Sequence, residues 1–156
     1  MSANLPRAAG QGSGPPRVFI SFDPKCDRDL YERLLGQCSM PGLGFSVLGG
    51  SESRAGNRAV ARRVRDEIEE ADQMIIICTE GTFGSGSVAE ELEAARGAGT
   101  PYLLLWGRRQ SMCTKPASAQ PSDVIYRWAQ DVLRDQVAFG ARRRRSRRQT
   151  AGRNPS

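Results

Sequence analysis

The chain has 156 residues, a formal net charge of +6 and no histidine. This length suits one domain that buries a core without needing disulfides or metals. The absence of histidine excludes Ser-His and Cys-His nucleophile pairs and imidazole metal ligands. We therefore expect no metal site, and any catalysis depends on carboxylates, hydroxyls, backbone dipoles or arginine.

Cysteine spacing and the composition of the N-terminal residues indicate in which cellular compartment the protein works. The four cysteines are far apart and include no Cys-x-x-Cys pair, which favours reduced thiols over disulfides or zinc. Residues 1–16 are rich in Gly, Pro, Ser and Ala; we interpret them as a disordered leader that lacks the apolar segment of a signal peptide. No run of 18 apolar residues follows, so we expect a cytoplasmic protein without membrane contact.

The positive charge is concentrated near the C-terminus. Residues 142–156 contain seven arginines and no acidic residue, which leaves a net charge of −1 on residues 1–141. We therefore divide the chain into the leader, an α/β domain at 17–139 and a basic tail at 140–156. The favoured interpretation of the tail is a solvated, disordered arm, and the alternative is weak, nonspecific contact with nucleic-acid phosphates.

Apolar runs with strand composition alternate with segments of helical periodicity. The predicted strands are residues 17–22, 45–48, 74–78 and 102–106. The predicted helices begin at Asp23-Pro24, Asn57, Ser87 and Pro121-Ser122. Because the strands are continuously apolar, they indicate a small parallel sheet covered on both faces. We predict an α/β, three-layer, flavodoxin-like fold.

Parallel strands bring the loops that follow them to one edge of the sheet. Three segments converge there: residues 21–23, the Gly/Ser-rich loop 49–57, and the loop that leads to Glu91. Open α/β sheets bind ligands at this edge. The sequence therefore predicts one cleft formed by these segments.

The helix after the third strand carries three acidic residues, Glu90, Glu91 and Glu93. Ser87 and Glu90 have the spacing of an N-terminal capping box, and Glu93 points away from the apolar stripe of the helix. Glu91 lies at the margin of that stripe, so we predict that it faces the cleft. The alternative is a helix-margin residue that only contacts solvent.

The helix after Asn57 has arginines in its first half and acidic residues in its second half, which the helix dipole disfavours. In the functional interpretation, Arg58 or Arg62 at the positive helix end attracts an anion such as a pyrophosphate. The favoured alternative is a solvated face joined by i,i+4 ion pairs, Arg62–Asp66, Arg63–Glu67 and Arg65–Glu69.

The absence of two common nucleotide-binding motifs narrows the reactions that the protein could catalyse. The glycines near residue 50 lack the G-K-[ST] ending of a P-loop, and no G-x-G-x-x-G follows the first strand. These absences give little support to a Walker-type ATPase or an ordinary Rossmann fold. Cleavage of a nucleotide's N-glycosidic bond stays open, because a carboxylate close to the ribose stabilises an oxocarbenium-like transition state without metal or histidine.

Several segments resemble the TIR-like domains, and most closely the bacterial TIR-like proteins of Thoeris antiphage systems. These segments are R-V-F-I-S-F-D (17–23), Q-M-I-I-I-C-T-E (73–80), the Ser-rich loop into E-L-E-A-A (91–95), and residues 113–133. The resemblance spans about residues 17–136. It implies an enzyme that consumes NAD⁺ as a substrate, with no cofactor, and breaks the nicotinamide–ribose bond. It also implies an ADP-ribose-derived signal for a partner effector, and self-association through TIR-type contacts.

The resemblance also implies roles for particular residues. By position, Glu91 matches the catalytic glutamate of the family. Family members commonly carry a tryptophan four residues earlier, where this chain has Ser87, and Phe83 is the aromatic that can substitute for it. The predicted substrate-binding residues are Ser21, Phe22, Asp23, Gly49, Ser51, Arg58, Phe83 and Ser87.

Three functions stay open from the sequence. The first is an NADase or ADP-ribosyl cyclase that uses Glu91. The second is a non-catalytic TIR-like module that senses a nucleotide signal or assembles with other TIR domains through its 49–57 loop. The third is a nucleic-acid-associated protein that acts through its arginine tail.

Overall fold

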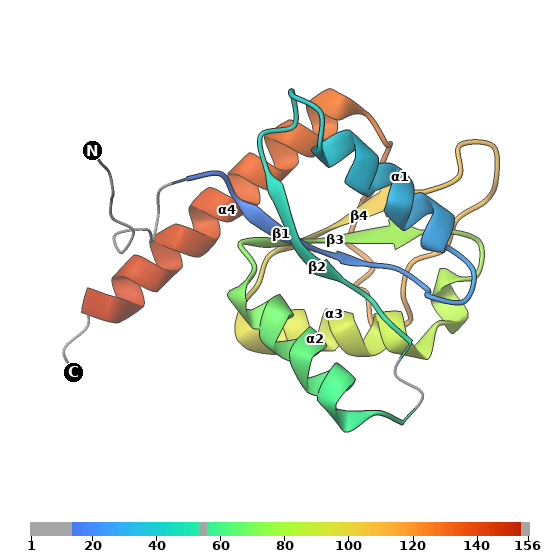
Figure 1. The fold of residues 1–156 in the computed structure, drawn as a ribbon, viewed down its shortest axis with the longest axis horizontal. Coiled ribbons are helices and arrows are strands. Elements are labelled where there is room, and N and C mark those ends of the chain that lie inside the picture. Colours follow the sequence, from blue (N-terminus) through green and yellow to red (C-terminus); the bar gives the residue numbers. More distant parts are fainter. Residues whose placement is uncertain (1–13, 54–55, 154–156) are drawn as a thin grey trace.

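The computed structural model describes residues 14–53 and 56–153, with side chains described as far as Thr150. Its five strands form one parallel sheet in the order β2-β1-β3-β4-β5 (Figure 1). The strands are β1 (Arg17–Ser21), β2 (Ser46–Gly50), β3 (Gln73–Cys78), β4 (Tyr102–Trp106) and β5 (Ile125–Tyr126). The helices are α1 (Arg28–Cys38), α2 (Arg58–Glu70), the 3-10 helix η1 (Thr82–Gly84), α3 (Gly86–Ala98) and α4 (Gln130–Arg153). This is the strand order of the flavodoxin-like fold, so the predicted fold is confirmed.

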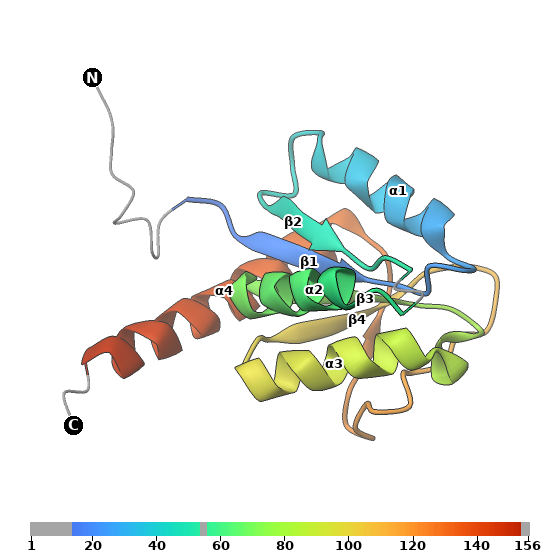
Figure 2. The ribbon, with the colours of Figure 1, turned by 60° about the horizontal axis from the view of Figure 1, so that its bottom comes forward.

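Helices cover both faces of the sheet (Figure 2). Ile75 and Ile77 of β3 pack in one apolar cluster with residues of α1 and α4. Met74 and Ile76 pack in a second cluster, on the other face, with residues of α2 and α3. All six residues of β3 are buried. A strand covered on both faces has no solvent side, which explains its continuously apolar sequence.

The order of the strands fixes which helix covers which face. The chain moves from β1 outward to β2 through α1, and then returns past β1 to β3 through α2. Right-handed connections in opposite directions place their helices on opposite faces of the sheet. The strand order reverses between β1 and β3, and the carboxyl edge beside this reversal is where such sheets bind ligands.

Two predicted helix boundaries are confirmed. The Asn57 side chain accepts hydrogen bonds from the backbone N–H groups of Ala59 and Val60 at 2.9 and 3.2 Å, which starts α2 as expected of an N-cap. Gly99 ends α3 with φ of 74°, the left-handed conformation that favours glycine at a helix C-terminus.

Two predicted helix starts are wrong. The N-cap of α3 is Ser85, whose hydroxyl accepts from the backbone N–H of Val88 at 3.4 Å, so Ser87 and Glu90 do not form the predicted capping box. The turn made by η1 places Ser85 in the extended conformation of an N-cap. Asp23 begins a turn instead of α1, because its carbonyl accepts from the N–H of Asp27 at 2.9 Å.

The segment after β4 also differs from the prediction. The helix expected from Pro121-Ser122 is wrong, because Ile125 and Tyr126 pair with Leu104 and Leu105 as strand β5. This pairing covers the free edge of β4, and an uncovered edge strand exposes unpaired backbone groups. The last helix, α4, begins at Gln130.

The predicted disordered tail is wrong over residues 140–153, because α4 continues without a break to Arg153. Arg144 is buried and donates to the carbonyl groups of Glu69 and Ala98, at 2.6 Å in both cases. These carbonyls lie at the C-terminal ends of α2 and α3, where a helix leaves carbonyls unbonded and carries a partial negative charge. The helix ends of the domain therefore hold the basic segment.

Asp72, directly after α2, holds two more arginines of α4. Its carboxylate pairs with Arg145 at 3.1 Å and with Arg148 at 3.3 Å, and it accepts from the backbone N–H of Arg17 at 2.9 Å. Asp72 is 4% exposed. The disorder predicted for the leader concerns mainly residues 1–13, which lie outside the described residues.

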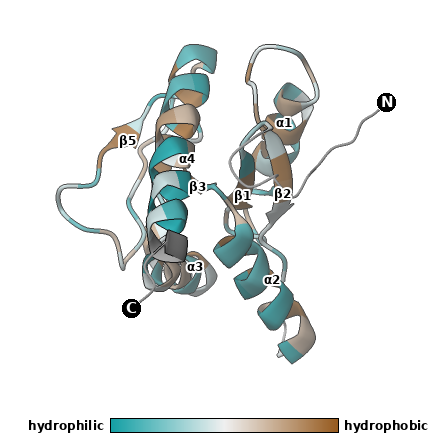
Figure 3. Cartoon of the chain, turned by 90° about the vertical axis from the view of Figure 1, so that its left-hand side faces the viewer, coloured by the Kyte–Doolittle hydropathy of each residue, from teal (hydrophilic) through white to brown (hydrophobic). Residues whose placement is uncertain are grey.

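Hydrophilic residues dominate α2 and much of α4 (Figure 3). Within residues 14–53 and 56–153, no helix combines the length and the apolar character that crossing a bilayer requires.

Candidate functional site

Two serine hydroxyls bind the carboxylate of Glu91. Ser21, the last residue of β1, donates from Oγ to Glu91 Oε1 at 2.6 Å. Ser51, directly after β2, donates to the same oxygen at 2.6 Å. Glu91 lies in α3 and is 1% exposed, and both serines are buried. One carboxylate oxygen thus joins the ends of two strands to the helix that follows the third.

A second hydrogen bond fixes the orientation of Ser51. The backbone N–H of Phe22 donates to Ser51 Oγ at 2.9 Å. Because an N–H group cannot accept, Ser51 uses its oxygen for Phe22 and its hydroxyl proton for Glu91. The N–H of Ser51 donates to the carbonyl of Ile20 at 3.0 Å. The backbone of β1 and of its following residue therefore sets the direction in which Ser51 points.

The two serine hydroxyls satisfy the buried carboxyl group of Glu91. Both O–H···O distances are 2.6 Å, at the short end of the range for such bonds. A buried carboxylate costs free energy unless it is hydrogen-bonded, and Ser21 and Ser51 supply such bonds. The cluster lies at the carboxyl edge, beside the reversal in strand order. A carboxylate at this place can stabilise positive charge that develops on a bound substrate.

Three of the residues predicted to line the cleft thus come together: Ser21, Ser51 and Glu91. The structure places two others elsewhere. Phe22 is buried against α1, where its ring stacks on Tyr31 with centroids 4.6 Å apart. Gly49 lies within β2, not in the expected flexible loop, and a Cβ there would collide with the carboxylate of Glu67.

The remaining predicted residues lie nearer the surface. Asp23 is half-buried and its carboxylate accepts from the backbone N–H of Lys25 at 3.0 Å. Phe83 on η1 is 65% exposed. Ser87 is half-buried on the first turn of α3, with its hydroxyl 3.4 Å from that of Ser85.

Arg58 begins α2 and is exposed. It lines a shallow hollow together with Arg62 and Arg65. The i,i+4 ion pairs predicted along α2 are absent among the described residues, and Arg63 instead pairs with Glu52 at 2.5 Å. Glu52 lies in the loop after β2, so that loop competes for the arginine with the acidic residues of the helix.

A buried acidic residue that the sequence patterns did not single out, Asp27, lies at the same edge of the sheet. The hydroxyl of Thr79, after β3, donates to its carboxylate at 2.8 Å. Arg108, after β4, donates to it at 3.3 Å. Burial raises the pKa of Asp27, while these two partners oppose that shift. The N-cap position directly before α1 is the signal that identifies Asp27.

Metal ligation has no support among the described residues. No group of three or more Cys, Asp or Glu side chains in residues 14–53 and 56–153 is placed to hold a metal ion. All four cysteines are free thiols.

Comparison with known protein families gave no match, and comparison with curated proteins gave none either. Among solved structures, the chain is similar to one described as the crystal structure of a prokaryotic SEFIR domain. The two share 15% sequence identity with a TM-score of 0.49, over 83% of this chain and 92% of that chain. A likeness at this level carries no information about ligand, activity or partner.

Proposed function

We propose that this protein cleaves the nicotinamide–ribose bond of NAD⁺ and that Glu91 stabilises the positive charge that develops on the ribose. One observation carries the proposal: Ser21 and Ser51 hold the Glu91 carboxylate at the ligand-binding edge of a flavodoxin-like sheet. The resemblance of these segments to TIR-like domains supports the same role for Glu91.

The reaction suits a site without histidine. Nicotinamide leaves as a neutral base, so the departing group needs no proton from the enzyme. The ribose becomes an oxocarbenium-like cation, and a fixed carboxylate lowers the energy of that transition state. Water then adds to the ribose with release of a proton and gives ADP-ribose. Attack by another atom of the same nucleotide gives a cyclic product instead.

We assign the substrate contacts to exposed residues near the N-terminal ends of α3 and α2. Phe83 presents an aromatic ring on η1, directly before α3, and we assign it to stacking against the substrate in place of the usual tryptophan. Arg58 and Arg62 line a hollow at the N-terminal end of α2, and we assign them to the pyrophosphate.

The wider proposal rests on the resemblance to Thoeris proteins. The product is an ADP-ribose-derived signal, linear or cyclic, that a partner effector recognises in antiphage defence. The protein works in the cytoplasm and self-associates through TIR-type contacts. Because Glu91 is 1% exposed, a ribose reaches it only after neighbouring side chains move.

The burial of Glu91 favours a second candidate function, a non-catalytic TIR-like module. In that case the hydrogen bonds from Ser21 and Ser51 only tie β1, β2 and α3 together. The module would bind a nucleotide signal or other TIR domains and would release no nicotinamide.

Nicotinamide release from NAD⁺ at several protein concentrations tests the proposal. We expect turnover in the wild type, a loss of at least about 100-fold in Glu91→Gln, and wild-type turnover in Glu93→Gln. Glu93 is exposed on the same helix, so it controls for the loss of one acid from α3. Undiminished turnover in Glu91→Gln would overturn the role of Glu91. Binding of cyclic ADP-ribose without any turnover by the wild type would support the non-catalytic module.

A further inference from the structure

The arginines of α4 divide between two sides of the helix. Arg144, Arg145 and Arg148 bond to the domain. Arg142, Arg143 and Arg147 are exposed, and no ion pair to them occurs within the described residues. At 3.6 residues per turn the exposed three span about 140° of the helix, centred opposite the bonded three.

The bonded arginines make the exposed ones a fixed surface. Arg144, Arg145 and Arg148 hold α4 against the ends of α2 and α3 and against Asp72. Beyond these contacts α4 projects from the side of the domain (Figure 1, Figure 2). The exposed side is therefore presented to solvent in one orientation, and the backbone that carries it has little conformational entropy left to lose on binding.

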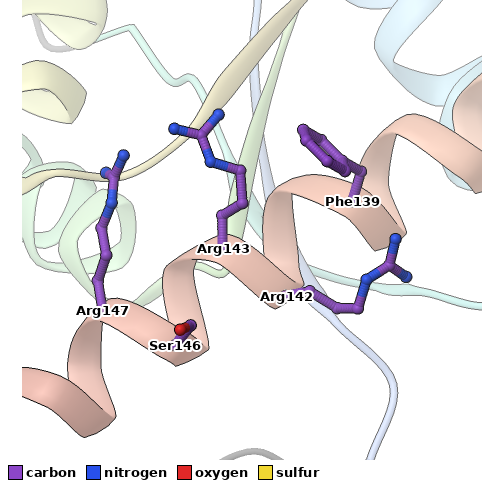
Figure 4. A pocket seen from close by; sticks show the side chains of 5 residues that line it. All are labelled: Phe139, Arg142, Arg143, Ser146 and Arg147. Atoms are coloured by element: carbon purple, nitrogen blue, oxygen red, sulfur yellow. The ribbon is translucent and has the colours of Figure 1, made fainter.

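An aromatic ring lies among the exposed arginines. Phe139 is 51% exposed, and the guanidinium of Arg143 lies 5.7 Å from its ring centroid. Figure 4 shows Phe139, Arg143 and Arg147 projecting to one side of α4, with Arg142 further round the helix. Together with Ser146 these residues line a shallow hollow, which we name the α4 basic face.

No acidic residue is among those that line the α4 basic face. Asp135, which pairs with Arg134, lies one turn before Phe139 and limits the face on that side. From residue 136 to the end of the sequence there is no acidic residue. The face thus favours a ligand that carries several negative charges.

We infer that the α4 basic face binds single-stranded nucleic acid, with Arg142, Arg143 and Arg147 on successive phosphates and a base stacked on Phe139. Guanidinium groups bind phosphate oxygens through paired hydrogen bonds. Single-strand binding surfaces combine such cations with exposed aromatic rings. In a duplex the bases already stack on one another, so the Phe139 ring gains no partner there.

Other polyanions fit this face less well. An interfacial membrane helix needs a broad apolar side, whereas Phe139 is the one large apolar side chain among the residues that line the hollow. The α4 basic face shares no residue with the cluster of Glu91, Ser21 and Ser51, so nucleic-acid binding can be tested independently of NAD⁺ cleavage.

Fluorescence anisotropy with a labelled 20-nucleotide oligo-dT tests the inference in the full-length protein. We expect R142Q/R143Q/R147Q to weaken binding at least about 10-fold. R33Q/R109Q/R127Q removes the same charge from exposed positions outside α4 and is expected to stay within about twofold of wild type. Three phosphate contacts predict a slope of about −2 in log affinity against log salt concentration for the wild type.

The Phe139→Ala variant distinguishes binding of single-stranded nucleic acid from binding of other anions. We expect about a 5- to 100-fold loss for oligo-dT, as for loss of a stacked base, and no change for a 20-base-pair duplex. If both triple variants lost the same affinity for oligo-dT, net charge alone would explain the binding, and the inference would be wrong. An unchanged oligo-dT affinity in Phe139→Ala, or wild-type binding to phosphatidylserine vesicles but not to oligo-dT, would also overturn the inference. Far-ultraviolet circular dichroism checks that α4 stays folded in each variant.

Discussion

Ser51 donates its hydroxyl proton to Glu91 at 2.6 Å while it accepts from the backbone next to β1. Replacing Ser51 by alanine removes a donor from a buried carboxylate and an acceptor from the buried N–H of Phe22. We expect the free energy of unfolding to fall by about 1–3 kcal/mol, the cost of buried polar groups left without a partner. Urea unfolding of Ser51→Ala measures this loss.

Ser53→Ala is the control for that variant, because Ser53 is exposed two residues further along the same loop. Exposed substitutions usually change stability by no more than about 0.5 kcal/mol. If Ser51→Ala were as stable as Ser53→Ala, the hydroxyl of Ser51 would not bind Glu91 in solution.

The convergence of Ser21, Ser51 and Glu91 was predictable because of the parallel sheet. Continuously apolar strands indicated parallel pairing, and parallel strands share one carboxyl edge, so residues after β1, β2 and β3 had to meet there. Local sequence favoured Ser87 as the cap of α3, because Glu90 three residues later gives it the spacing of a capping box. The turn of η1, which that spacing does not reveal, makes Ser85 the cap instead.

The basic tail was predicted wrongly for a different physical reason. Seven arginines with no acidic neighbour indicate a solvated arm when only local sequence is considered. Their partners lie far away in the chain: Arg144 bonds to Ala98 and Glu69, 46 and 75 residues earlier. Bonds over such separations leave no periodic trace in the sequence of the tail.

Asp27 and Asp29 predict opposite responses of stability to pH. Burial raises the pKa of Asp27 above 3.8 in the folded protein, so the stability that depends on its protonated form is present below pH 3.8 and is lost as pH rises through the raised value. The asparagine of Asp27→Asn does not ionise, so this variant does not lose that stability as pH rises. Its side-chain carbonyl still accepts from the Thr79 hydroxyl. We therefore expect the stability of Asp27→Asn relative to wild type to increase with pH just above 3.8.

Asp29 is the matched comparison. Its hydrogen bond with Arg108 lowers its pKa below 3.8, so its contribution is present above pH 3.8 and is lost as pH falls through the lowered value. Relative to wild type, Asp29→Asn is expected to lose stability as pH rises just below 3.8. Urea unfolding between about pH 3 and 7 measures both slopes. Slopes of the same sign in the two variants would contradict the burial of Asp27.

A substitution of Phe83 tests substrate binding with little effect on the stability of the fold. Because the side chain is 65% exposed, Phe83→Ala is expected to change the free energy of unfolding by no more than about 0.5 kcal/mol. If the ring stacks on NAD⁺, kcat/KM for nicotinamide release falls by about 2- to 13-fold, in line with about 0.5–1.5 kcal/mol for an aromatic contact. Phe139→Ala, an exposed phenylalanine on α4, is the control. Equal kcat/KM values for the two variants would remove Phe83 from the substrate site.

Arg144 and Arg143 are neighbours in sequence with opposite roles in α4. Arg144 is 8% exposed and donates to the carbonyls of Glu69 and Ala98, whereas Arg143 is exposed. Arg144→Ala leaves two helix-end carbonyls without these donors, and we expect a loss of at least about 1.5 kcal/mol, since a hydrogen bond from a charged group contributes about 1.5–3 kcal/mol. Arg143→Ala is expected to stay within about 0.5 kcal/mol of wild type. Urea unfolding compares them, and equal stabilities would mean that the C-terminal half of α4 detaches from the domain in solution, which would also release the α4 basic face from its fixed orientation.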